Sequence, residues 1–462
     1  MNINSNKSID MRNGAVLPAV IRFSLPIMAG NVLQLMFGAA DMIVAGRFAG
    51  SGALAAVGAN TSLINLIVNL FIGLSLGTNI VTARFYGAES VRDVQETVRT
   101  AVAMSLICGG GLGVFGAAAA PVLLRGLGTP GDILGSAVCY LRIYSVGMPL
   151  VMLYNFGSAA VTAAGDTKRP LYCLMTAGAA NVTLNVFFVA GMGWGVAGVA
   201  AATVLSNGIS AGMILRCLCR GGGAVDLKLR ELRLYGDKVG EILRVGVPAG
   251  LQGVGFSISS VIIQAAVNSF GAAAVAGNTA TISIEGFLYT AMYGFYQSCS
   301  TFTAQNAGAG RFDRVGRVLY VCLGCAFAAG TLAAILCLGF DELLAGMYCS
   351  DPSATAVAVT RMWIVFPLYA LCGMNDVMAG SMRGMGHSAA PLVVSTLGAC
   401  VFRILWIATV FRWLGSLESL YVSYPVSWVL TFAAHFLCFQ AIRRRTGNVD
   451  RRLCLPVKER GN

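Results

Sequence analysis

The stretch at residues 318–340 reads VLYVCLGCAFAAGTLAAILCLGF and contains no charged side chain. A run of about twenty apolar residues forms a helix long enough to cross the ~30 Å hydrocarbon core of a bilayer. Similar runs recur along the chain, whose 462 residues are 56% hydrophobic and only 11% charged. Soluble domains carry about 25% charged residues. The composition therefore predicts an all-α polytopic membrane protein and argues against a soluble enzyme.

Twelve apolar runs of this kind predict twelve transmembrane helices. Several are longer than a bilayer requires, and such helices tilt or bend in the membrane. Pro26 in the first run and Pro248 in the seventh each remove a backbone donor, so we expect kinks there. The predicted spans are residues 16–42, 53–82, 97–120, 133–160, 169–192, 195–217, 242–268, 272–304, 316–340, 354–382, 389–412 and 417–441.

The positive charges of the chain lie at the ends of the apolar runs rather than in one basic patch. The net charge is +12. Lys and Arg gather in the N-terminal tail, in the loops after the even-numbered spans and in the C-terminal tail, whereas the opposite loops hold only Arg47, Arg125 and Arg412. Because cytoplasmic loops carry the excess of Lys and Arg, both termini are predicted to be cytoplasmic. The charge therefore indicates topology, and no nucleic-acid partner is expected.

The two halves of the sequence resemble each other at a constant offset of 221 or 222 positions. Each half has six spans, an even number, so both halves have the same orientation in the membrane. This pattern predicts two six-helix lobes that are parallel repeats, related by a pseudo-twofold axis along the membrane normal. The matching segments are IRFSLP (21–26) and LRVGVP (243–248), ARFYGAESVRDV (83–94) and AQNAGAGRFDRV (304–315), and AGDTKRPL (164–171) and MGHSAAPL (385–392).

The repeat and the charge pattern together divide the chain into five parts. The basic stretch at 218–240 is expected to be a solvated loop between the lobes. The predicted parts are a cytoplasmic N-terminal tail (1–14), an N-lobe of spans 1 to 6 (15–217), a cytoplasmic linker (218–241), a C-lobe of spans 7 to 12 (242–441) and a basic cytoplasmic tail (442–462).

One carboxylate, Asp41, lies inside the first span among apolar neighbours. Ionisable side chains inside a membrane are rare and mark functional sites. At ~1.5 Å per residue, Asp41, Asn185 and Thr203 lie at similar depths in spans 1, 5 and 6, and Asn181 shares a helix face with Asn185. Their oxygens are hard ligands that suit Na⁺, or a proton on the carboxylate. We predict a cation-coupling site there; the alternatives are a helix cap or a pair with Arg47 for Asp41, and packing hydrogen bonds for the asparagines.

The second half carries intramembrane charges of its own, with Glu285 in span 8, Asp376 in span 10 and Arg403 in span 11. A guanidinium cannot shed its charge, so we expect Arg403 to pair with Glu285 or Asp376, directly or through water. This C-lobe polar network could respond to substrate or carry protons, or it could be a structural ion pair. Four further polar residues on apolar spans are predicted to line a cavity: Gln34, Asn155, Gln264 and Asn278.

Six stretches resemble the multidrug and toxic compound extrusion (MATE) transporters, and the resemblance covers nearly the whole chain, from about residue 15 to 442. These stretches are specific together rather than singly. They are AADMIVAGRFAGSGALAAVG (39–58), LFIGLSLGTNIVTARFYGA (70–88), LYNFGSAAVTAAGDTKRPL (153–171), ISIEGFLY (282–289), TAQNAGAGRFDRV (303–315) and GSMRGMGHSAAPL (380–392).

The resemblance implies two lobes of six helices, a V-shaped cavity, and export of organic, often cationic, compounds coupled to entry of H⁺ or Na⁺. In related transporters a span-1 Asp and polar residues of spans 5 and 6 form the N-lobe cation site, which matches Asp41 and its neighbours. Some members have Asp where this chain has Asn185, which puts any two-carboxylate scheme in doubt here. We interpret the chain as a secondary active multidrug antiporter of the cell membrane that works by alternating access.

A flippase of lipid-linked oligosaccharides, from the same superfamily, is the alternative function. Its large anionic substrate should require several cavity-facing arginines, but only Arg142, Arg361 and Arg403 fall inside spans. The chain has no phosphate-binding loop that would indicate ATP, and no His and Cys ligands at zinc spacing.

Cys322 and Cys325 form a C-x-x-C inside an apolar run, where packing is the expected role. We therefore expect no enzyme activity, no cofactor, and no metal beyond Na⁺ at the coupling site. The expected protein is a monomer whose partners are the lipid bilayer and small organic substrates.

Overall fold

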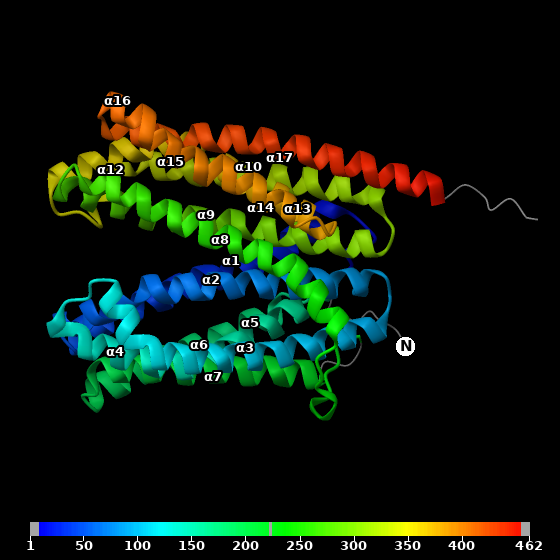
Figure 1. Cartoon of the computed structure of the whole chain (residues 1–462), viewed down its shortest axis with the longest axis horizontal. Helices are drawn as coiled ribbons and strands as arrows, with labels where there is room; N and C mark the ends of the chain where they lie inside the picture. The colour runs from blue at the N-terminus through cyan, green and yellow to red at the C-terminus, as the bar shows by residue number, and fades with distance from the viewer. Residues whose placement is uncertain (1–8, 221–223, 454–462) are drawn as a thin grey trace, which may run out of the picture. The chain divides into compact units, whose positions relative to one another are not determined.

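The computed structural model describes residues 9–220 and 224–453, and over these residues the chain is almost entirely helical, without a strand (Figure 1). The helices of the first half are α1 (Val16–Phe48), α2 (Ser51–Gly87), α3 (Val91–Gly126), α4 (Gly131–Val146), α5 (Met148–Ala163), α6 (Lys168–Asn185), the π-helix η1 (Val186–Gly191) and α7 (Gly195–Arg220).

The second half repeats this succession after a short 3₁₀ turn, η2 (Leu229–Glu231). Its helices are α8 (Gly236–Asn268), α9 (Ala272–Gly308), α10 (Phe312–Gly339), α11 (Asp341–Gly346), α12 (Pro352–Val365), η3 (Phe366–Leu368), α13 (Ala370–Gly384), α14 (Ala389–Ser395), η4 (Thr396–Val401), α15 (Phe402–Trp406), η5 (Ile407–Phe411), α16 (Arg412–Leu414) and α17 (Leu417–Leu453). Here η3 is a 3₁₀ turn, and η4 and η5 are π-helices.

Each predicted span coincides with one helix or with one succession of adjoining helices. Nine helices of the described part are long and apolar enough to cross a membrane, or eleven when two bent pairs each count as one span. The bent pairs are α4 with α5, at 46°, and the segment 352–368 with α13, at 45°. The all-α multi-span fold is confirmed, and the helices are consistent with twelve spans.

One further long helix, α9, has 37 residues, but it is too polar to be counted among the eleven. Many of its Ser, Thr and Asn side chains are buried. Some of these polar groups bond within the helix: Thr281 and Ser298 each donate to the backbone carbonyl four residues earlier. Such bonds let a polar helix lie inside an apolar protein interior.

The two predicted kink sites, Pro26 and Pro248, lie inside α1 and α8, and neither proline interrupts its helix. Large apolar side chains cover much of the outer surface, among them Val114, Leu332 and Trp413, the last of which is 86% exposed. A surface of this kind is suited to lipid rather than water.

The chain divides into two compact units, Met1–Ser257 and Ile258–Asn462, and each has its own apolar core. In the first unit α5 contacts α2, α3 and α7 (Figure 1). In the second unit α13 contacts α9, α10 and α17, which are the corresponding helices of the repeat. The lobe boundaries at 15–217 and 242–441, and the axis relating the lobes, stay predictions.

The internal repeat extends to individual hydrogen bonds. Asn60 Nδ2 donates to the carbonyl of Ala137 at 3.1 Å, and Thr281 Oγ1 donates to the carbonyl of Ala358 at 3.3 Å. Both the donors and the acceptors of these two bonds are 221 positions apart in the sequence. The prediction of two repeated lobes is therefore confirmed by contacts inside each unit.

The stretch 218–240 was expected to be a solvated loop, and most of its residues between 228 and 237 are exposed, but it also packs on the rest of the first unit. Ala224 and Leu227 are buried in the core of the first unit. Glu231 pairs with Arg99 of α3, and the Tyr235 amide donates to Thr100 Oγ1 at 3.3 Å. The linker was misjudged because a high density of Lys and Arg conceals the few apolar residues that hold it to the protein.

Candidate functional site

The structure brings together the four residues predicted for cation coupling. Asp41 lies on α1, Asn181 and Asn185 on the last turns of α6, and Thr203 on α7. Asn185 Nδ2 donates to Asp41 Oδ1 at 2.5 Å and to Asn181 Oδ1 at 3.2 Å. Thr203 Oγ1 lies 3.4 Å from Asp41 Oδ2 and donates a shorter bond, 2.9 Å, to the Val199 carbonyl. Their role in binding a cation stays a prediction.

Burial and one unsatisfied amide oxygen characterise this cluster. Asn185 is fully buried and Asp41 is half-buried. The Asn185 Oδ1 atom is buried and has no hydrogen-bond partner among the described residues. A buried acceptor without a donor is costly. The cluster therefore contains a carboxylate and, on the side chain that bonds to it, an amide oxygen without a donor; both are oxygen types that bind cations.

The alternative of an ion pair between Asp41 and Arg47 receives no support. Arg47 is exposed at the end of α1, and in the part of the chain that the structure describes Asp41 has no Lys or Arg within salt-bridge distance. The carboxylate is instead set in an apolar surrounding, since Val44, Val189 and Val199 belong to one buried cluster next to it. An unpaired carboxylate in such a place favours binding of a monovalent cation or a proton.

A π-helix, η1, begins directly after Asn185. Single π turns occur often at functional sites. In this chain the π turn is also part of the repeated fold, because the second unit has a π-helix, η5, that starts at Ile407, 221 positions beyond Val186. The polar ligands, and not the π turn, therefore distinguish the first unit.

The C-lobe charges are arranged differently from the prediction. Glu285 Oε1 pairs with Arg361 Nη2 at 2.6 Å, and Arg361 is 1% exposed. Arg361 Nη1 also donates to the Asn278 side chain at 2.6 Å, and Asn278 Nδ2 donates to Gln264 at 2.8 Å. These four residues form a continuous polar network between α8, α9 and α12.

A direct pair of Arg403 with Glu285 or Asp376 does not form among the described residues, and a pairing through water stays a prediction. Among the described residues Arg403 makes no ion pair; its Nε donates to Ser427 Oγ at 3.0 Å, and its guanidinium lies 4.2 Å from the Tyr424 ring centre. Asp376 accepts a hydrogen bond from Tyr289 Oη at 2.9 Å. The stacking contact and the hydroxyl partner compensate Arg403 in place of a carboxylate.

The residues predicted to line a cavity divide into two groups. Gln264 and Asn278 belong to the network of Arg361, whereas Gln34 is exposed on α1 and Asn155 donates to the Val151 carbonyl of its own helix. Whether the four line a cavity stays a prediction. Among the described residues, no three His, Cys, Asp or Glu side chains gather as for a metal ion.

Sequence reasoning missed Arg361 as the partner of Glu285. The repeat offered a signal, because Ile64 and Tyr140, which lie 221 positions before Glu285 and Arg361, belong to one cluster in the first unit. Two positions in contact in one half of a repeat are expected to be in contact in the other.

An all-α multi-span protein with two repeated lobes, and with a carboxylate site inside one of them, has the features of a membrane transporter. The sequence profile of the MatE family matches residues 26–187 and 248–408, one match in each half of the repeat. The chain belongs to the MatE family, as the resemblance predicted. It is therefore a multi-pass membrane transporter and not an enzyme.

Individual relatives agree with this placement. The chain is 27% identical over 435 residues to a "Probable multidrug resistance protein YpnP" of Bacillus subtilis, covering 94% of this chain and 97% of that protein. It is 24% identical to a protein named "FAD transporter" of Shewanella oneidensis, covering 95% of each. Among solved structures, an "Outward-facing conformation of a multidrug resistance MATE family transporter of the MOP superfamily" matches with a TM-score of 0.90, at 21% identity, covering 96% of this chain and all of the other.

Proposed function

We propose that this protein is a secondary active multidrug efflux transporter, which exports organic, often cationic, compounds in exchange for entering H⁺ or Na⁺. The observation that carries the proposal is the half-buried Asp41 carboxylate, which contacts Asn185 and Thr203 and is not paired with a basic side chain among the described residues. Membership of the MatE family supports the transport activity.

The coupling needs no contact between the cation and the exported compound. A cation that binds Asp41 in one conformation and a compound that binds the other conformation drive each other's transport by shifting one equilibrium. One carboxylate with neutral oxygen neighbours matches one monovalent cation. In the sodium version the Asn185 and Thr203 oxygens complete the coordination of Na⁺, and in the proton version Asp41 itself is protonated.

The substrate class is the less constrained part of the proposal. Relatives are named both as multidrug resistance proteins and, in one case, as an FAD transporter. The flippase alternative is not favoured, because two of its three candidate arginines are already engaged, Arg361 by Glu285 and Arg403 by aromatic rings and Ser427. Export of organic cations is the version that we carry forward.

The orientation also remains part of the proposal, with both termini in the cytoplasm of a cell-membrane protein. A cysteine placed at Lys228, which is exposed on the linker, should resist an impermeant thiol reagent added to intact cells. Labelling of that cysteine from outside would reverse the assigned topology.

The test of function uses the purified chain in liposomes that contain a fluorescent cationic dye. Na⁺ and pH gradients are imposed separately, in both directions. We expect dye to move against its own gradient when one of the two ions flows down its gradient. Dye movement that is independent of both gradients would contradict the antiport proposal. Flipping of a labelled anionic lipid-linked sugar without dye transport would support the flippase function.

A further inference from the structure

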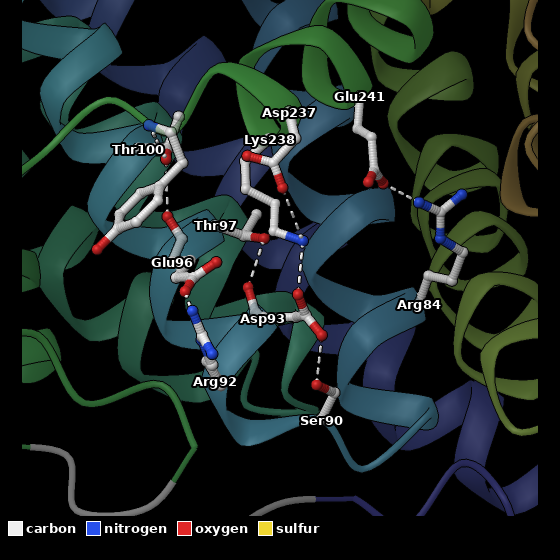
Figure 2. Close-up of polar contacts among 11 residues, drawn as sticks. Arg84, Ser90, Arg92, Asp93, Glu96, Thr97, Thr100, Asp237, Lys238 and Glu241 are labelled. Atoms are coloured by element: carbon white, nitrogen blue, oxygen red, sulfur yellow. Dashed lines mark hydrogen bonds and ion pairs between the residues drawn. The ribbon is translucent and has the colours of Figure 1, made fainter.

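The beginning of α8 is held to the first unit by a buried lysine. Lys238 Nζ lies 2.6 Å from Asp93 Oδ1 of α3 (Figure 2). It also lies 3.9 Å from the centre of the Phe85 ring of α2, and the Lys238 side chain is only 4% exposed. Asp93 also accepts a hydrogen bond from Ser90. A buried ammonium without its carboxylate would be costly, so this pair holds the start of α8 close to α3.

A second ion pair lies one helical turn further along α8. Glu241 pairs with Arg84 of α2, and about a third of each side chain is exposed (Figure 2). All four charged residues lie outside the predicted spans 53–82, 97–120 and 242–268. The charges therefore lie at the ends of the helices, outside the predicted membrane core, where water can reach them when the helices separate.

Beyond the charges, α8 and α2 touch through glycines, which we call the glycine seam (Gly73, Gly77, Gly246 and Gly250). A Cβ added at Gly73 would lie 2.2 Å from the Gly250 nitrogen, and one added at Gly77 would lie 2.5 Å from a carbonyl oxygen of α8. Backbone therefore lies directly against backbone. Small residues permit this approach, and a surface without interlocking side chains can separate and close again.

The same helix also belongs to the second unit. α8 runs without a break from Gly236 to Asn268, and the division between the two units falls at Ser257. A change in the arrangement of the units must therefore either separate the first half of α8 from α2 and α3 or bend α8.

We propose that this interface is a gate: α8 separates from α2 and α3 when the transport pathway opens at the end that carries the linker. The inference rests on the proposed transport function, because only a conformational cycle requires such a step. Lys238–Asp93 and Glu241–Arg84 are the pairs that hold the gate closed, and the glycine seam fixes how closely it shuts.

The placement of the charges lowers the free-energy cost of separating α8 from α3, because neither Lys238 nor Asp93 is left without a polar partner. Asp237, on α8 itself, lies 3.6 Å from Lys238 and accompanies it when it leaves Asp93. Asp93 keeps Ser90, which lies at the start of its own helix. Each charge thus retains a polar partner in the open state, and water supplies the remainder. The linker stays attached meanwhile, through buried Ala224 and Leu227.

The test measures the distance between spin labels on α3 and α8. The labels are attached to Arg92→Cys and Gly240→Cys, in the full chain with its native cysteines replaced. Arg92 is strongly exposed, and a side chain at Gly240 meets no atom within 4 Å. We expect a short and a long distance in the labelled protein. Neutralising the two pairs with Lys238→Gln and Glu241→Gln should raise the ratio of long to short about fivefold or more.

Three comparisons make that result specific. The exchange Asp93→Lys with Lys238→Asp should restore the short distance. Lys228→Gln, which removes a lysine of the linker whose ion pair among the described residues is with Glu231, should leave the ratio unchanged. Gly73→Ala should favour the long distance, whereas Gly253→Ala, whose Cβ would make an ordinary 3.7 Å contact, should not.

The gate and the proposed function can fail separately. A single short distance in the parent and in the neutralised variant would overturn the gate. The gate would also be overturned by full dye export from protein in which a short bifunctional thiol reagent links positions 92 and 240. The antiport proposal would be unaffected by that result. If the distances respond as expected and no dye is exported, the gate stands and the multidrug function fails.

Discussion

Asn185 bonds to Asp41 and has an amide oxygen without a donor. Among the neutral residues of the cluster, its removal should therefore weaken cation binding most. If Na⁺ is the coupling ion, Asn185→Ala should raise the Na⁺ concentration for half-maximal dye export roughly tenfold, because one ligand to a charged group contributes about 1.5–3 kcal/mol. The measurement is dye export from liposomes against Na⁺ concentration and against pH. Thr183→Val, which alters an exposed hydroxyl on the same helix, serves as the control and should leave both curves in place.

An unchanged ion dependence in Asn185→Ala would mean that Asn181 and Asn185 only pack the helices. In that case the cluster would reduce to Asp41 and Thr203.

Arg361 gives the residue-scale prediction for stability. Arg361→Gln leaves Glu285 buried without its cation, and breaking a buried pair from one side costs about 3–5 kcal/mol. Thermal unfolding in detergent should therefore show a clear fall in Tm. Adding Glu285→Gln in the same chain should recover most of the loss, since the remaining amides can bond to each other. A double variant as unstable as the single one would show that Arg361 acts through Asn278 instead.

At the scale of elements, close helix contacts depend on glycines at particular positions. A Cβ at Gly109 of α3 would lie 2.6 Å from the Pro149 Cα of α5, whereas a Cβ at Gly111 meets nothing within 4 Å. Gly109→Ala should lower the free energy of unfolding by about 1–3 kcal/mol through overpacking. Gly111→Ala should be neutral or slightly stabilising, because Ala favours a helix by up to ~1 kcal/mol over Gly. Equal melting temperatures for the two variants would contradict the tight α3–α5 contact.

Helices and the repeat could be read from the sequence because each leaves a long, periodic or duplicated pattern. All twelve predicted spans coincide with helices, and the depth of Asp41, Asn185 and Thr203 followed from counting along three of them. What counting cannot give is which helix faces which. Arg361 is 76 positions from Glu285, and only the packing of α9 on α12 brings them together. The packing of the linker was missed for a different reason, since its two buried apolar residues are few among many charges.

At the scale of the whole molecule, the two units share one fold but place their polar groups differently. Where the first unit has Asp41 and Asn185, the second has Ile263 and Trp406 at the repeat offset. Conversely, the Glu285–Arg361 pair of the second unit corresponds to Ile64 and Tyr140 of the first. A duplicated scaffold thus carries a carboxylate bonded to an amide in one half, and in the other a charge pair together with Asp376, which is bonded to the Tyr289 hydroxyl. This asymmetry supports the proposal that cation coupling belongs to the first unit.

The most direct measurement of that assignment compares two kinds of dye transport in liposomes for the parent and for Asp41→Asn. The substitution keeps the size of the side chain and removes its charge, so the variant should fold and should still exchange labelled for unlabelled dye without any ion gradient. We predict that it loses the export driven by an imposed H⁺ or Na⁺ gradient. Gradient-driven export by Asp41→Asn at the rate of the parent would contradict the account, because Asp41 would then be structural and the coupling ion would bind elsewhere.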